Sequence, residues 1–87
     1  MTDNNDPKAT RLELDYPVTV KAAEYKTLKM RRPKVKDQLV AERGGVTQAE
    51  RETVLFANLC DVSPEVIEEL DMKDYAKLQE RYEGFLA

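Results

Sequence analysis

The stretch LKMRRPKVKDQL, residues 28–39, marks the point at which the chain is expected to change from a strand to a helix. Leu28 and Met30 alternate with basic residues, which is the two-residue period of a half-buried strand. Pro33 then interrupts the pattern, and proline suits the first turn of a helix because its missing N–H has no intrahelical partner there. Beyond it, apolar residues recur at helical spacing, at Val35, Leu39 and Val40. We therefore expect a joint from strand to helix, with a short apolar stripe on the helix.

The residues before the joint predict a β-hairpin over 11–32. Every second residue is apolar at Leu12, Leu14, Tyr16, Val18 and Val20. This period predicts a strand with one buried face, and Pro17 on the other face suits an edge strand. We expect the turn at residues 21–24, KAAE, although it lacks the glycine or asparagine of common hairpin turns. Tyr25 is out of phase with Leu28 and Met30, so we expect a bulge near Thr27, or Tyr25 packed at the hairpin end.

The residues after the joint predict four helices, at about 34–43, 47–61, 64–70 and 72–85. Gly44 and Gly45 favour a left-handed cap at the end of the first helix. Thr47 with Glu50 forms the pattern of a capping box at the start of the second. That second helix is apolar on nearly all sides towards its end, so we expect it to be the central, most buried one.

The last two helices have their own start signals. Ser63 followed by Pro64 is a cap with a first-turn proline, and Asp71 is the expected cap of the final helix. In the final helix, one face is formed by Tyr75, Leu78, Tyr82 and Phe85. The predicted fold class is α+β: a small N-terminal antiparallel β-hairpin packed on three to four short α-helices. Residues 1–10 are polar and are expected to form a flexible N-terminal tail, and residues 11–87 a single domain.

Composition restricts the cellular setting. No apolar run approaches the ~18–20 residues of a membrane span, and the first ten residues, MTDNNDPKAT, lack the basic and apolar regions of a signal peptide. The single cysteine, Cys60, has no partner for an internal disulfide. We therefore expect a cytoplasmic protein without a membrane partner.

The residues that usually carry catalysis are scarce. The chain has no histidine, and Cys60 lies among apolar residues, where a buried, inert thiol is expected. Ser63 has a capping position and no base near it in sequence, and the carboxylates fall mostly on predicted solvent-facing sides of helices. We therefore expect neither an enzyme nor a cofactor or metal site.

Charge is divided unequally along the chain. Residues 1–45 carry 10 Lys/Arg and 7 Asp/Glu, a balance of +3, and residues 46–87 carry 4 and 10, a balance of −6. This asymmetry indicates oriented contact with a partner or between copies of the protein, unless each half merely keeps its own surface soluble. The basic joint is either a solvated surface paired to acids such as Asp37 or a protein-binding patch. Nucleic acid is a third possibility, disfavoured because the patch lacks interleaved aromatic residues.

The apolar residues of the last helices exceed what a two-stranded sheet can cover. Either all of them belong to the core, or part of them forms a groove for an amphipathic helix. Combining both features, we expect partner contacts at Arg31, Arg32, Lys34, Lys36, Leu55, Leu59, Leu78, Tyr82 and Phe85.

Two groups of residues form a recognisable pattern. The first, in the joint, is Tyr25, Leu28, Arg31, Pro33 and Asp37. The second, in the segment ANLCDVSPEVIEELDMKDYAKLQ, is Leu59, Cys60, Pro64, Ile67, Leu70, Asp74, Tyr75 and Leu78. Through these residues, the chain from about Leu12 to Phe85 resembles the tail assembly chaperones of contractile-tailed phages of the Mu and P2 types.

The resemblance implies a non-catalytic protein without cofactors. It implies that the protein binds the long, helical tape measure protein, keeps it soluble and helps to recruit tail tube subunits. It also implies a location in the cytoplasm of the bacterial host and absence from the finished virion. Two alternatives stay open: a small nucleic-acid-associated phage regulator using the basic joint, and a subunit that associates with itself.

Overall fold

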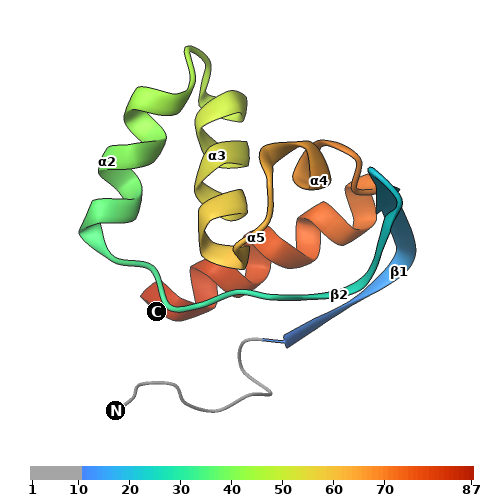
Figure 1. The fold of residues 1–87 in the computed structure, drawn as a ribbon. Coiled ribbons are helices and arrows are strands. Elements are labelled where there is room, and N and C mark those ends of the chain that lie inside the picture. The colour runs from blue at the N-terminus through green and yellow to red at the C-terminus, as the bar shows by residue number, and fades with distance from the viewer. Residues whose placement is uncertain (1–10) are drawn as a thin grey trace.

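The computed structural model describes residues 11–87 and shows a two-stranded hairpin followed by four helices, which confirms the α+β prediction. The strands and helices are β1 (Arg11–Val20), β2 (Ala23–Lys29), α2 (Val35–Gly44), α3 (Gln48–Cys60), α4 (Pro64–Glu68) and α5 (Met72–Leu86). Helix α3 stands in the middle, with α2 on one side and α4 on the other, and the hairpin packs against α3, α4 and α5 (Figure 1). The predicted flexible tail, residues 1–10, lies outside the described residues.

The hairpin is irregular next to Thr27, as expected, but the extra residues belong to β1, and Tyr25 packs against the core. Glu13 pairs with Thr27 and Val18 pairs with Tyr25, so four residues of β1 stand opposite one residue of β2. Because of this shift, Tyr25 lies on the same face of the hairpin as its buried partner Val18. This accounts for the position of Tyr25 out of phase with Leu28 and Met30. The shift also turns Tyr16 outward, with 54% of it exposed, so the prediction that Tyr16 faces the core is wrong.

The hairpin turn is shorter than the four residues expected. It consists of Lys21 and Ala22, with φ of 51° and 69°, between Val20 and its partner Ala23. Two consecutive residues with positive φ are the signature of the type I′ turn, whose twist matches that of the strands. The chain adopts this turn without glycine and therefore carries left-handed strain at two side-chain-bearing residues.

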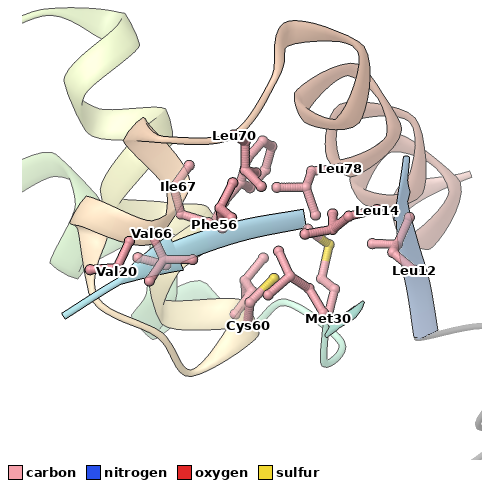
Figure 2. Packing of buried hydrophobic residues seen from close by; sticks show 14 residues of the cluster. Leu12, Leu14, Val20, Met30, Phe56, Cys60, Val66, Ile67, Leu70 and Leu78 are labelled. Atoms are coloured by element: carbon pink, nitrogen blue, oxygen red, sulfur yellow. The ribbon is translucent and has the colours of Figure 1, made fainter. Parts of the chain in front are cut away.

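The core lies between the hairpin and α3, α4 and α5 (Figure 2). Phe56 on α3 is fully buried, with the rings of Tyr75 and Tyr82 tilted against it at centroid distances of 5.6 and 5.8 Å. The buried cluster comprises Leu12, Leu14, Val18, Val20, Leu28, Met30, Phe56, Ala57, Leu59, Cys60, Val66, Ile67, Leu70 and Leu78. The expected central position of α3 and the single apolar face of α5 are both confirmed.

Helix α2 carries its predicted apolar stripe on the solvent side. Its apolar residues Val35, Leu39 and Val40 are exposed by 77%, 53% and 39%, whereas its buried residues are Asp37 and Ala41. The apolar stripe therefore faces solvent, whereas Asp37 and Ala41 lie on the inner side of α2.

The two glycines at the end of α2 are needed for space and not for a left-handed cap, which corrects that prediction. Gly45 has an extended backbone, with φ of −159°. A Cβ atom on Gly45 would lie 2.6 Å from Cβ of Glu50, and one on Gly44 would lie 2.9 Å from Cγ1 of Val54. The left-handed cap occurs instead at Asp61, after α3, with φ of 57°.

The predicted starts of α3, α4 and α5 are borne out, whereas Pro33 lies before the N-cap of α2, Lys34, and not in its first turn. Thr47 and Glu50 form the capping box, each accepting a 3.1 Å hydrogen bond from the backbone N–H of the other. Asp71 accepts a 2.9 Å bond from the N–H of Lys73. Ser63 occupies the cap position of α4, but its side chain makes no capping hydrogen bond.

Candidate functional site

The joint between β2 and α2 is fixed by an ion pair between two of its own residues. Arg31 donates two hydrogen bonds to the carboxylate of Asp37, of 2.9 and 2.6 Å, and the backbone N–H of Lys34 adds a third of 2.8 Å. The Asp37 side chain is 2% exposed, whereas that of Arg31 is 46% exposed. The Arg31 guanidinium, with the Lys34 N–H, holds the pKa of Asp37 below its usual value. Arg31 therefore has a structural task, and a partner can reach only its outer edge.

Arg32 connects the joint to the far end of the chain. Its guanidinium donates a 3.3 Å hydrogen bond to the carbonyl of Phe85 and lies 5.6 Å from the centre of the Phe85 ring. Beside Phe85, Tyr82 is half-buried and Leu86 is 63% exposed. Arg32, Tyr82, Phe85 and Leu86 thus form a surface with aromatic, aliphatic and cationic components, which we call the α5-end patch.

The structure separates the other predicted contact residues. Lys34 and Lys36 are exposed at the start of α2, and Leu55 is half-buried on α3. Leu59 and Leu78 are 1% and 0% exposed, so neither is available to a partner in this conformation. Whether the exposed members bind a partner stays a prediction.

A second buried carboxylate, Asp74, was missed by the prediction that acids face solvent. It is 0% exposed and accepts hydrogen bonds from the backbone N–H groups of Asp15 and Tyr16, at 2.9 and 3.0 Å. Lys77 lies 3.3 Å from it and 3.1 Å from Asp15. Burial raises the pKa of Asp74, but these hydrogen bonds outweigh burial and hold it below the usual value. The sequence signal for this acid was Tyr25, whose position out of phase indicates a bulge. A bulge leaves backbone N–H groups without a strand partner, and these need an acceptor.

The Cys60 thiol is buried, and the Tyr75 hydroxyl is paired. Burial raises the pKa of the Cys60 thiol to about 12, so it stays protonated at neutral pH. Tyr75 donates its hydroxyl to Glu52, and burial together with this bond raises its pKa. Within residues 11–87, no group of three or more acids and cysteines is placed to hold a metal ion. None of the helices over the same residues is long and apolar enough to cross a membrane.

Comparison with known proteins identifies the family. The family model for "Phage tail assembly chaperone proteins, E, or 41 or 14" matches residues 11–87. No match was found among curated proteins or solved structures. Because the match covers the hairpin, the joint and all four helices, the chain belongs to this family of phage tail assembly chaperone proteins.

Proposed function

We propose that the protein binds the tape measure protein of its phage, keeps it soluble and helps to recruit tail tube subunits. Family membership supports a role in tail assembly. The observation that carries the finer proposal is the α5-end patch, where apolar and aromatic surface remains accessible although the core is already closed.

The α5-end patch has the composition of a protein-binding surface. Aromatic residues and arginine are enriched at interfaces because they bury large areas with little loss of rotamer freedom. Phe85 is already restrained by packing on the core and by Arg32, and Tyr82 by the ring of Phe56. A helical client with an apolar stripe therefore meets side chains that are largely preorganised, which reduces the entropic cost of binding.

The charge of the protein suits the task of keeping such a client soluble. A tape measure protein is implied by the family to be long and amphipathic, and exposed apolar stripes promote aggregation. Each bound copy covers part of a stripe and adds a net charge of −3. Each copy binds the client with moderate affinity, so that the tail tube can displace it. The proposed protein acts in the host cytoplasm and is not an enzyme.

Co-expression with the tape measure gene of the same phage tests the proposal. We expect the tape measure protein to be soluble only when this chain is present. The double variant Arg32→Ala, Leu86→Ser should reduce the soluble fraction, because it removes the exposed half of the α5-end patch. The matched control Lys29→Ala, Tyr16→Ser changes an exposed cation and an exposed apolar residue on the hairpin.

A client equally soluble with wild type and the Arg32→Ala, Leu86→Ser variant would reject the α5-end patch. A client that is soluble without the chaperone would reject the function. Retention on heparin that falls steeply with salt would favour the nucleic-acid alternative instead.

A further inference from the structure

The solvent side of α2 is a basic and apolar surface without a partner in the fold. The α2 outer face consists of Val35, Lys36, Leu39, Val40 and Arg43, all exposed. Neither Lys36 nor Arg43 has an acidic group of residues 11–87 within ion-pairing distance, although Lys36 contributes to lowering the pKa of Asp37. Isolated exposed apolar residues are common, but three on one short helix form a contiguous docking surface.

A surface of opposite charge lies at α4 and the loops that flank it. The acidic segment, residues 61–72, contains no lysine or arginine, and its acids are Asp61, Glu65, Glu68, Glu69 and Asp71. All five are exposed, and so is Met72, by 76%. The segment therefore offers five exposed acids and, at its end, an accessible apolar side chain.

The two surfaces cannot meet within one molecule. Asp37 and Ala41 turn the inner side of α2 towards α3, and Val66 and Ile67 turn α4 towards the core. Helices α2 and α4 stand on opposite sides of α3 (Figure 1). Each surface is therefore available to a second molecule.

We propose that the α2 outer face of one copy docks on the acidic segment of a second copy. The α2 outer face carries two cations, Lys36 and Arg43, and no acid, whereas the acidic segment carries five acids and no cation. Within one molecule, Asp61 interacts with Arg31, and Glu65 lies 4.0 Å from Lys21. Complementary charges steer the encounter and fix its orientation, and the exposed valine and leucine side chains of α2 bury apolar area against Met72. The occupant is a second copy because this chain itself supplies both complementary surfaces.

The contact joins two different surfaces, so an open assembly keeps one surface of each kind free at its ends, and a closed ring uses them all. Contacts of this type generate rings or open chains. Each contact is small and therefore weak, but copies held along a filamentous client would gain from multivalency. The inference goes beyond the proposed function and does not depend on it, because it concerns the protein alone.

Sedimentation velocity of the purified chain over a range of concentrations tests the inference. We expect self-association at low salt that weakens as NaCl is raised from about 0.05 to 0.5 M, because exposed charges are screened. The variant Lys36→Glu, Arg43→Glu should associate at least about tenfold more weakly, since it places like charges opposite each other. The variant Glu68→Lys, Glu69→Lys should lose association equally.

Mixing these two monomeric variants should restore association, because each then finds a complementary surface on the other. The control Lys26→Glu, Lys29→Glu makes the same charge change on the exposed side of the hairpin and should associate as wild type. Circular dichroism of every variant checks that the fold is retained.

Three results would overturn the inference. The first is a wild-type chain that stays monomeric up to about 1 mM at low salt. The second is a mixture that stays monomeric although both variants are folded. The third is a Lys36→Glu, Arg43→Glu variant that self-associates normally but no longer solubilises the tape measure protein. That third result would assign α2 to the client, and would leave the proposed function intact.

Discussion

The carboxylate of Asp74 accepts a 2.9 Å hydrogen bond from the backbone N–H of Asp15, 59 residues earlier in the chain. The register shift in β1 leaves the N–H groups of Asp15 and Tyr16 without a partner on β2. Asp74, in the first turn of α5, satisfies both of them and thereby joins the hairpin to the last helix. The bulge and the buried acid are thus two parts of one structural device.

Replacing Asp74 with asparagine should destabilise the protein by about 1.5–3 kcal/mol. An amide has a single oxygen to accept hydrogen bonds, so one buried N–H group loses its partner, and the charge that strengthens both bonds is removed. Urea unfolding followed by circular dichroism measures the change. The control Glu80→Gln, an exposed acid on the same helix, should change stability by less than about 0.5 kcal/mol. Equal effects of the two substitutions would contradict the role of Asp74.

Replacing Arg31 with methionine should cost about 1–3 kcal/mol, because the Asp37 carboxylate stays buried and keeps only the N–H of Lys34. Methionine preserves the aliphatic part of the arginine side chain, so the loss of stability measures the contribution of the ion pair. The stability of Arg31→Lys should lie between that of wild type and that of Arg31→Met, since an ammonium group keeps the charge but cannot donate two parallel hydrogen bonds to the carboxylate. Arg32→Met is the matched control, and thermal unfolding of all three measures the difference. A stable Arg31→Met variant would show that Asp37 does not need this partner.

Local patterns predicted the elements of the fold because each depends on a few neighbouring residues. The alternation from Leu12 to Val20, the capping box at Thr47 and the cap at Asp71 are examples. The sequence pattern did not indicate which side of α2 faces inward, because that orientation is decided by contacts outside the helix. Arg31 pulls Asp37 inward, and the close approach to α3 admits only small side chains such as Ala41.

The candidate site was less predictable than the fold. The contact between Arg32 and Phe85 joins residues 53 positions apart, and no periodicity in the sequence indicates it. Leu59 and Leu78 were expected to be surplus apolar residues, but the bulged hairpin and α4 cover them fully. The number of apolar residues in a sequence indicates the size of the core. Which of these residues stay exposed depends on how the helices and strands pack.

Substituting glycine for Ala22 should stabilise the protein by about 0.5–1 kcal/mol. Ala22 has φ of 69°, where a Cβ atom is strained and glycine is not. Ala23→Gly is the matched control, because Ala23 begins β2 and is not among the residues with positive φ, so glycine there should destabilise. Denaturant midpoints compare the two variants. A four-residue turn at 21–24 would give similar effects at both positions, which would contradict the two-residue turn.

The stability of the protein should fall at acid pH. Asp37 and Asp74 have pKa values held below those of the unfolded chain, the first mainly by Arg31 and the second by hydrogen bonds that outweigh its burial. As the pH falls below about 4, the usual pKa of aspartate, the unfolded chain therefore binds more protons than the native state does. The native state loses stability in that range. Urea midpoints measured from pH 7 down to 3 test this. Asp74→Asn should show a shallower decline than wild type, and an identical slope would contradict the assignment.

Stability should also fall at alkaline pH, for the opposite reason. Burial raises the pKa of Cys60 to about 12 and also raises that of Tyr75, so both stay protonated in the native state. The unfolded chain releases the thiol proton above about pH 8.5, and each further pH unit then costs about 1.4 kcal/mol until the native thiol ionises. Cys60→Ala should lose this dependence between pH 8.5 and about 10, where tyrosine begins to contribute. Urea midpoints over that interval measure it, and a wild-type protein whose midpoint stays constant would show that Cys60 is accessible to solvent.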